Sequence, residues 1–260
     1  GDFYMLTEIV VSLNLFLLVF ARLGAMIFPS PVFGRKNVPM RIRAGLVLAL
    51  TLLLVPVLNA GAVSALSGFD MVEGLVREIL LGLIVGFVFQ IFFFMIFVAG
   101  DMLDTVFGLA MGKVMDPGGG VQVSVLGQFL NVFFFLYFFA TGSHRLMIKL
   151  FAYSFELIPA GAAAVSMEKA GPFVLALFHS VFVLAIRLTL PFVAAEFVLE
   201  AAMGVLMKLI PQIHIFVINL QVKIIAGILL MMLFAVPMGQ FIDWYIGTLF
   251  EDVQKLLLQL

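Results

Sequence analysis

The chain has 260 residues, of which 64% are hydrophobic and 11% are charged, and its mean hydropathy is +1.25. A soluble globular domain is about half apolar and about a quarter charged, so this composition excludes that class and indicates a membrane protein. The formal net charge of −1 gives no reason to expect nucleic acid as a partner, and the absence of cysteine excludes disulfides and thiolate metal sites. The sequence opens without a basic region before an apolar core, so we expect no signal peptide.

Apolar runs along the chain predict helices. A helix needs about 20 apolar residues to cross a hydrocarbon core of about 30 Å. Strands are not expected, because an open sheet edge cannot lie in lipid. About six hydrophobic segments approach the required length: 9–21, 44–69, 79–100, 117–143, 170–186 with its continuation 188–195, and 224–242. We therefore predict an all-α, membrane-associated fold, with residues 1–260 as a single domain.

Prolines and charged residues interrupt these runs. A proline removes a backbone donor and tends to kink or end a helix. A charge at the centre of a lipid-facing helix costs roughly 2.5–3.5 kcal/mol on insertion scales. Helices with such charges are expected to pack mainly against protein, inside an assembly. The residues to which we assign this assembly role are Arg22, Arg187, Glu196, Glu200, Lys208 and Lys223.

The loop GRKNVPMRIR, residues 34–43, contains four basic residues and no acidic one. Cytoplasmic loops carry an excess of lysine and arginine, so we expect this loop on the cytoplasmic side. The next connecting loop is expected at the polar patch of residues 67–78, which is net negative and fits the opposite side. The later patches 101–116 and 144–149 do not alternate in charge, so the sequence predicts no further topology.

Two pairs of residues at helical spacing allow a structural and a functional interpretation. Gly82 and Gly86 lie four apart in an apolar run, which favours close packing of a neighbouring helix. Glu196 and Glu200 lie on one helical face, where like charges repel. They fit either an exposed helix end or a buried pair that needs a cation from Arg187 or from another subunit.

No catalytic, cofactor or metal site is predicted. The sequence lacks an HExxH motif, and Asp101 and Asp104 border their apolar run instead of lying inside it, so we find no catalytic constellation. A proton-coupled transporter would use Glu196 and Glu200 as a relay. Such a transporter often carries an inverted repeat, and the sequence shows none, so this function is the less favoured alternative.

The glycine-rich segment GLAMGKVMDPGGGVQ, residues 108–122, lies between two apolar runs. A Walker-type phosphate loop has four residues between its two glycines and a Ser or Thr after its lysine. Here only three residues separate Gly108 from Gly112, and Val114 follows Lys113. We therefore do not expect this segment to bind a nucleotide.

Two interpretations of this segment remain open from its residues. Asp116 and Pro117 precede three glycines, which suits a tight turn because proline presets one dihedral and glycine accepts positive φ. Met111 and Met115 add unbranched side chains that fill irregular gaps. A passive connecting loop and a mobile apolar lip are both compatible with this composition.

Several stretches in order along the chain carry a family resemblance. AGDMLDTVFGLAMGKVMDPGGG (99–120) looks like a central signature in which an AG-x-x-x-D run leads to a glycine-rich loop with Asp-Pro. FARLGAMIFPSPVFGRKNVPMRIRAGLVLALTLLLVPVL (20–58), SFELIPAG (154–161), LTLPFVAAEFVLEAAMGVLMKLIPQIHIF (188–216) and LQVKIIAGILL (220–230) match in the same way. Nearly the whole chain thus resembles the flagellar biosynthetic protein FliR family and its virulence-secretion counterparts.

The resemblance implies a non-enzymatic core subunit of the flagellar type III export gate. Its fold would be helical hairpins wound into a helical assembly, around a narrow channel for unfolded substrates. A virulence-type (injectisome) gate is the alternative. The resemblance also implies that a loop over residues 108–120 plugs the channel, and carried over by position its residues are Gly108, Met111, Gly112, Lys113, Met115, Asp116, Pro117, Gly118, Gly119 and Gly120.

The same resemblance implies partners and a location. The expected partners are FliP-type and FliQ-type subunits, FlhB, unfolded export substrates and membrane lipid, without cofactor or nucleic acid. The expected location is the bacterial inner membrane at the flagellar basal body, with parts held above the bilayer on the periplasmic side.

Overall fold

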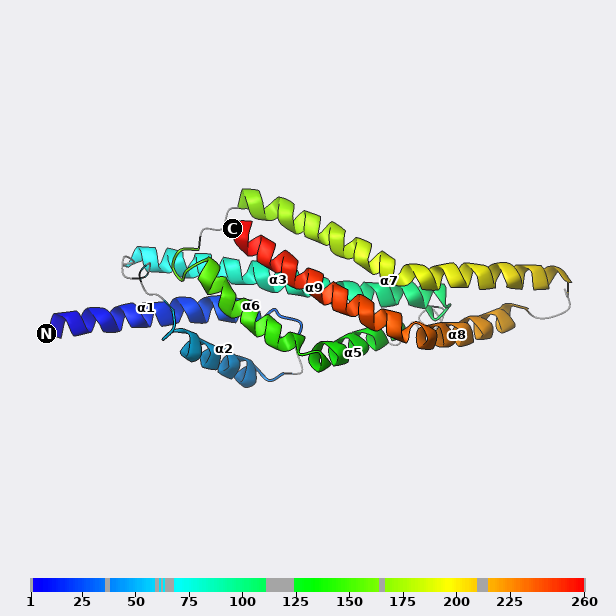
Figure 1. Ribbon diagram of the computed structural model, residues 1–260, viewed down its shortest axis with the longest axis horizontal. Coiled ribbons are helices and arrows are strands. Elements are labelled where there is room, and N and C mark those ends of the chain that lie inside the picture. Colours follow the sequence, from blue (N-terminus) through cyan, green and yellow to red (C-terminus); the bar gives the residue numbers. More distant parts are fainter. Residues whose placement is uncertain are drawn as a thin grey trace, which may run out of the picture. The chain divides into compact units, whose positions relative to one another are not determined.

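The computed structural model describes residues 2–35, 38–58, 61, 63, 68–110, 124–163, 167–209 and 215–259. These residues form eight α-helices (Figure 1), so the predicted all-α fold is confirmed. The helices are α1 (Asp2–Ile27), α2 (Met40–Leu54), α3 (Phe69–Val106), α5 (Val125–Ala140), α6 (Ser143–Leu157), α7 (Met167–Leu209), α8 (Ile215–Leu233) and α9 (Ala235–Gln259).

Three of the described helices are long and apolar enough to cross a membrane. They are Glu8–Ile27 of α1, the whole of α3, and Gly171–Leu209 of α7. Two bent pairs, α5 with α6 and α8 with α9, pass the same test when each pair counts as one span. The described part of the chain therefore holds three to five candidate spans.

The helices form two compact units whose segments alternate along the chain. Unit 1 comprises Gly1–Phe92, Gly142–Phe178 and Thr248–Leu260, and unit 2 comprises Phe93–Thr141 and His179–Gly247. Helices α3, α7 and α9 contribute residues to both units. The single domain over residues 1–260 stays a prediction.

Unit 1 is built on close packing of α3 against α1. A Cβ atom at Gly82 would lie 2.6 Å from the Cβ of Ala25, and one at Gly86 would lie 2.7 Å from Cγ of Pro29. Real Cβ atoms do not approach so closely, so the two helices can lie at this distance only because α3 has glycine there. The ring of Phe89 then contacts α6 and the second half of α9, edge-on to Phe151 at 5.8 Å and to Phe250 at 6.3 Å.

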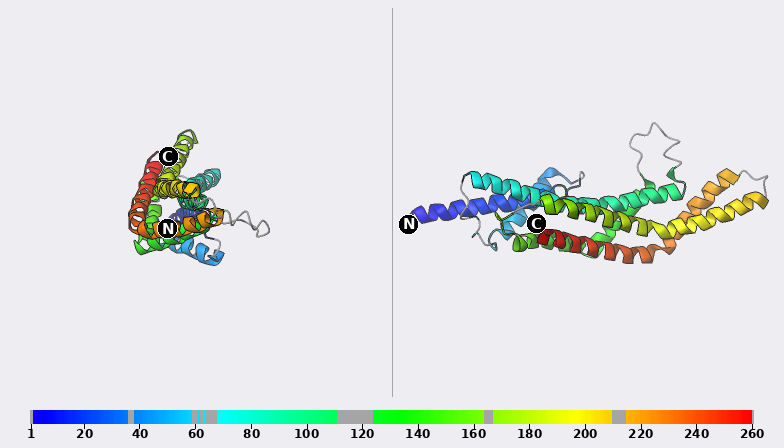
Figure 2. Two further views of the ribbon diagram at one scale, coloured as in Figure 1. Left: turned by 90° about the vertical axis from the view of Figure 1, so that its right-hand side faces the viewer. Right: turned by 90° about the horizontal axis from the view of Figure 1, so that it is seen from above.

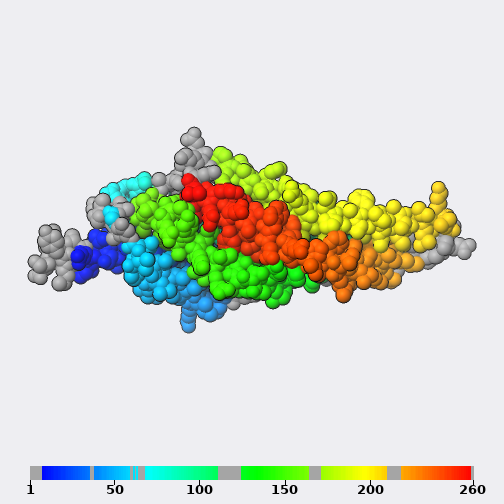
Figure 3. Space-filling view, viewed as in Figure 1, coloured from blue at the N-terminus to red at the C-terminus, as the bar shows by residue number. Residues whose placement is uncertain are grey.

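Unit 2 holds α5 against the first half of α9. The Tyr137 hydroxyl donates to Oδ2 of Asp243 at 2.6 Å, and the ring of Phe134 meets Tyr245 edge-on at 6.1 Å. In the space-filling view the green surface of α5 lies directly against the orange of α9 (Figure 3). In the same unit, the second half of α7 and α8 run side by side as a hairpin, as the yellow and orange ribbons show from two directions (Figures 1 and 2).

Two of the predicted helical segments have different bounds in the structure. The apolar run 44–69 does not form one long helix, because α2 ends at Leu54, two residues before Pro56, which has no N–H to continue it. The run 224–242 is divided at Phe234, between α8 and α9. Pro237 fits in the first turn of α9, where backbone N–H groups have no partner within the helix.

The acidic patch 67–78 is not the loop that the sequence predicted. Helix α3 starts at Phe69 and includes most of this patch. The charged residues in these first turns form ion pairs. Arg77 pairs at the surface with Glu73 one turn earlier, and Glu78 pairs with a buried arginine of α1.

Candidate functional site

A buried ion pair lies at the centre of unit 1. Arg22 of α1 and Glu78 of α3 have no exposed side-chain surface. The guanidinium donates to both carboxylate oxygens, from Nε to Oε2 and from Nη2 to Oε1, the latter at 2.9 Å. This two-point geometry fixes the relative rotation of the two side chains as well as their separation.

The same pair also binds the end of α6. Nη1 of Arg22 donates to the carbonyls of Ser154 at 3.0 Å and Ile158 at 2.7 Å, at the C-terminal end of α6, where the helix dipole favours a cation. Oε1 of Glu78 accepts the N–H of Gly161 at 2.8 Å. The pair thus joins three helices of unit 1, and the assembly role assigned to Arg22 stays a prediction beside these contacts within the chain.

Lys223 of α8 lies between the two glutamates of α7. Its Nζ is 3.0 Å from Oε1 of Glu196 and 3.2 Å from Oε1 of Glu200. Glu196 is buried, whereas the side chain of Glu200 is 58% exposed. Of the two alternatives, an exposed helix end and a buried pair that needs a cation, each fits one of the glutamates, and the cation beside both is Lys223 of the same chain. The assembly role assigned to these three residues stays a prediction.

The remaining predicted assembly charges lie at the surface. The side chains of Arg187 and Lys208, both on α7, are exposed. Their role in binding another subunit stays a prediction.

The residues just before the glycine-rich segment, at the end of α3, pack against α7 and α8. The buried ring of Phe107 meets Phe192 edge-on at 6.3 Å, and a Cβ at Gly227 would come within 2.8 Å of the same ring. Gly108 follows with φ of 74°, a conformation that favours glycine. A Cβ at Gly108 would lie 2.9 Å from Cδ1 of Leu220, the end of a flexible side chain that can shift, so the positive φ disfavours a larger residue here more than the contact does.

Helix α5, which follows the segment in the sequence, begins against the same helix, α3. Oδ2 of the buried Asp104 accepts the N–H of Val125 at 2.8 Å, and its Oδ1 accepts the N–H of Leu126 at 2.9 Å. Ser124 caps the helix locally, since its Oγ accepts the N–H of Gly127 at 2.8 Å. Both flanks of the segment therefore have defined contacts in unit 2.

Most of the predicted plug lies outside the described residues. Gly108 is described, as above. The others, Met111, Gly112, Lys113, Met115, Asp116, Pro117, Gly118, Gly119 and Gly120, lie outside the described ranges.

Sequence reasoning missed the partners that complete these sites. Glu78 was assigned to a loop, although it borders an apolar run and a buried arginine requires a carboxylate. Asp104 is the aspartate of the AG-x-x-x-D run, but its target, the start of α5, lies about 20 residues later in the chain. Phe107 and Gly227 gave no signal, because aromatic and glycine residues are common throughout the chain.

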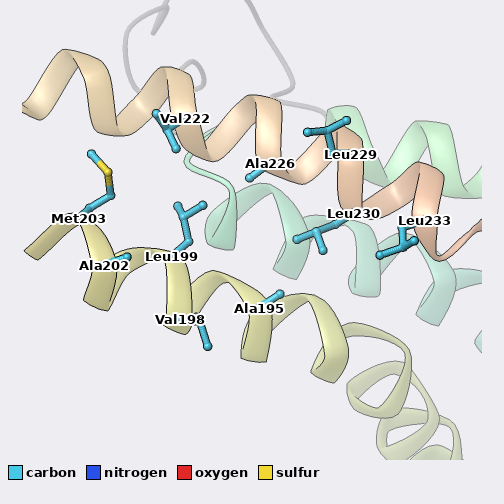
Figure 4. Close-up of a pocket in the computed structure, with 10 residues that line it drawn as sticks. All are labelled: Ala195, Val198, Leu199, Ala202, Met203, Val222, Ala226, Leu229, Leu230 and Leu233. Atoms are coloured by element: carbon cyan, nitrogen blue, oxygen red, sulfur yellow. The ribbon is translucent and has the colours of Figure 1, made fainter. Parts of the chain in front are cut away.

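An apolar groove of about 470 Å³ opens between α7 and α8 (Figure 4). Its lining side chains run from Ala195 to Met203 on α7 and from Val222 to Leu233 on α8, and Figure 4 shows only carbon on them apart from the sulfur of Met203. Such a lining suits hydrocarbon and offers no group that binds a polar substrate.

Comparison with known proteins identifies the family. The family described as "Bacterial export proteins, family 1" matches residues 13–249. The flagellar biosynthetic protein FliR of Bacillus subtilis (strain 168) is 28% identical over 218 residues, 83% of this chain and 84% of that protein. FliR of Escherichia coli (strain K12) is 27% identical over 254 residues, 95% and 94% of the two chains. The Yop proteins translocation protein T of Yersinia pestis is 27% identical over 199 residues, 76% of each chain.

The match over most of its length shows that the chain belongs to the bacterial export proteins, family 1. The predicted resemblance to FliR and its virulence-secretion counterparts is confirmed. The protein is accordingly a non-enzymatic membrane component of a flagellar or other type III export apparatus.

Proposed function

We propose that this member of the bacterial export proteins, family 1, is a core subunit of the flagellar export gate, with residues 108–120 as the gating plug of its channel. The flagellar assignment is supported by matches to FliR proteins over 83% to 95% of the chain. An injectisome gate is the second candidate, supported by the shorter match to the Yop proteins translocation protein T.

The composition of the proposed plug suits a gate. A gate must block ions when idle and yet part for an unfolded polypeptide. Glycines such as Gly118 to Gly120 accept many backbone conformations, which permits rearrangement. Met111 and Met115 offer flexible apolar side chains that can pack again around a new neighbour. A hydrophobic constriction of this kind excludes ions by dewetting.

The observation that carries the proposal is the anchoring of both flanks of the segment. On one side Phe107 packs between Phe192 and Gly227, and on the other Asp104 binds the first N–H groups of α5. Helices with such contacts do not depend on the residues between them. A change within residues 108–120 can therefore alter a closed channel while the helices around it stay folded.

The proposal extends to partners and location. The proposed partners are FliP-type and FliQ-type subunits and FlhB, which together with this chain would surround the path of unfolded substrates. The proposed location is the bacterial inner membrane within the flagellar basal body, with parts above the bilayer on the periplasmic side. Three to five candidate spans in the described residues support residence in a membrane.

Deleting Gly118 to Gly120 tests the plug. The shortened segment should leave the complex assembled but make growing cells permeable to small solutes, because a breached apolar constriction readmits water. Replacing Met111 and Met115 by alanine should cause a smaller leak, since the seal loses volume but keeps its backbone.

Replacing Gly118 to Gly120 by valine should act in the opposite direction. β-Branched residues resist positive φ, so the gate should stiffen and export should slow. Solute permeability and export rate are measured on complexes of equal yield. If all three variants assemble and match the unmodified protein in both, the segment is a connector and the plug assignment is wrong.

A further inference from the structure

Gly100 and Asp104 of α3 lie outside the proposed plug, and both contact the start of α5. Both lie before the glycine-rich segment, in the run AGDMLD, residues 99–104. Their partners lie after the segment, in the first turn of α5. Two independent contacts, one polar and one steric, thus join α3 to the start of α5.

The polar contact is a helix cap supplied from another helix. The first N–H groups of a helix have no partner within it, and a carboxylate there also meets the positive end of the helix dipole. Asp104 gives one oxygen to Val125 and the other to Leu126, at 2.8 and 2.9 Å, and it is completely buried. Ser124 takes the next N–H, from Gly127. The first turn of α5 is therefore fixed in position and direction by α3.

The steric contact is a glycine pair one turn earlier on α3. A Cβ at Gly100 would overlap the backbone N and Cα of Gly127, and a Cβ at Gly127 would lie 3.1 Å from the carbonyl oxygen of Phe97. At Gly100 all the near atoms belong to the backbone, so no side chain can adjust to relieve a substitution there. The two glycines thus determine where α3 and α5 cross, because they let the backbones approach closely. Asp104 determines which residues of the two helices lie opposite each other.

We propose that Asp104, together with the Gly100–Gly127 contact, is the positioning element of the plug: it closes the base of the segment between residues 108 and 124. This inference rests on the proposed function of that segment. With this contact made, residues 108 and 124 start from one frame, and the spacing between the two flanks of the plug is fixed. Without the contact, the first turn of α5 is no longer held in position by α3, and the spacing between the flanks can change.

Asp101 provides a matched control for Asp104. It is an aspartate on the same helix, one turn nearer its start, and its side chain is exposed. Replacing either residue by alanine removes the same charge from α3. Only the Asp104 replacement removes the acceptors of Val125 and Leu126.

The base can be observed directly, because the chain contains no cysteine. Thr105 and Val125, both with exposed side chains beside the Asp104 contact, are replaced by cysteine and labelled with nitroxides in the assembled complex. Electron paramagnetic resonance should show dipolar broadening between the two labels in the parent and in Asp101→Ala. The broadening should be clearly reduced in Asp104→Ala, which frees the first turn of α5, and reduced less in Asp104→Asn, which keeps one acceptor oxygen.

Solute permeability of the same complexes separates this inference from the proposed function. Reduced broadening with a leak in Asp104→Ala supports both proposals. Reduced broadening without a leak supports the role of Asp104 at the base but overturns the plug. Unchanged broadening in Asp104→Ala overturns the inference, whatever the permeability. If neither Asp104→Ala nor Asp104→Asn assembles, Asp104 is required for folding and its assignment as a positioning residue is wrong.

Discussion

Arg22 and Glu78 form an ion pair that is completely buried between α1 and α3, 56 residues apart in the sequence. The ring of Phe155 lies against the guanidinium, with its centroid 4.2 Å from Cζ, and carbonyls of the α6 end take the remaining donors. The charges are thus compensated inside unit 1, which explains how an arginine is tolerated in a helix that could span a membrane.

Breaking this pair should strongly destabilise the protein. Removing one partner of a buried ion pair leaves an uncompensated charge, at a typical cost of about 3–5 kcal/mol. Arg22→Met or Glu78→Gln should therefore lower the recovery of the complex and its unfolding temperature in detergent. The double variant Arg22→Met/Glu78→Gln should be less damaging than Arg22→Met alone, because no uncompensated charge remains. A double variant as unstable as the sum of the two single ones would contradict the pairing.

Gly82 should not tolerate even alanine. Its added Cβ would lie 2.6 Å from the Cβ of Ala25 and from the carbonyl oxygen of Arg22, so the helices must separate. Overpacking of this kind costs typically about 1–3 kcal/mol. Gly45→Ala on α2 is the matched control, because nothing lies within 4 Å of its Cβ position. The unfolding temperature should fall for Gly82→Ala and stay level or rise for Gly45→Ala. Equal unfolding temperatures for the two variants would contradict the close packing of α3 against α1 at Gly82.

The cluster around Lys223 should respond unequally to its two glutamates. Lys223→Met leaves the buried Glu196 without its cation, whereas Glu200→Gln alters an ion pair that is largely exposed, a kind worth about 0–1 kcal/mol. We expect a large loss of stability for Lys223→Met and almost none for Glu200→Gln. Adding Glu196→Gln to Lys223→Met should restore part of the loss, since the remaining group is uncharged. No restoration in the double variant would exclude charge as the cause.

Arg187 should matter for assembly and not for the fold of the chain. Its side chain is exposed on α7, and the assembly role assigned to it predicts a contact with another subunit. Arg187→Leu should reduce recovery of the complex with FliP-type and FliQ-type partners. A second expectation concerns the unmodified chain, which should aggregate when it is produced without these partners. Normal complex yield with reduced transport would instead favour a proton relay. A folded, monodisperse chain in the absence of partners would contradict the assembly requirement itself.

The sequence predicted the helical class and the family, because both depend on properties summed over many residues. Hydropathy identified α3 and α7 through their apolar length. Hydropathy could not identify the first turns of α3, which contain charged residues. Glu78 is buried in this helix because it pairs with Arg22, which lies far away in the chain. The polar patch 67–78 was therefore predicted as a loop, although most of it belongs to α3, where Glu78 pairs with Arg22.

The candidate site was predicted in part for a similar reason. The glycine-rich composition of residues 108–120 is local and was visible in the sequence. The roles of Asp104 and Gly100 depend on the start of α5, which follows that segment, and no local rule connects them. Gly82 and Gly86, by contrast, follow a simple helical spacing, and the structure places both against α1.

The alternation of the two units along the chain has a consequence for biosynthesis. Unit 1 needs residues 248–260, which leave the ribosome after all of unit 2, and Phe250 from this last part contacts Phe89. The early helices must therefore wait, with apolar surface uncovered, while about 150 further residues are translated at roughly 5–20 residues per second. During this interval of several seconds to half a minute, α1 and α3 depend on lipid, on the membrane insertion machinery or on a neighbouring chain to cover them. Termination of translation within the first half of α9 would leave unit 1 without Phe250, and the ring of Phe89 would lose this contact.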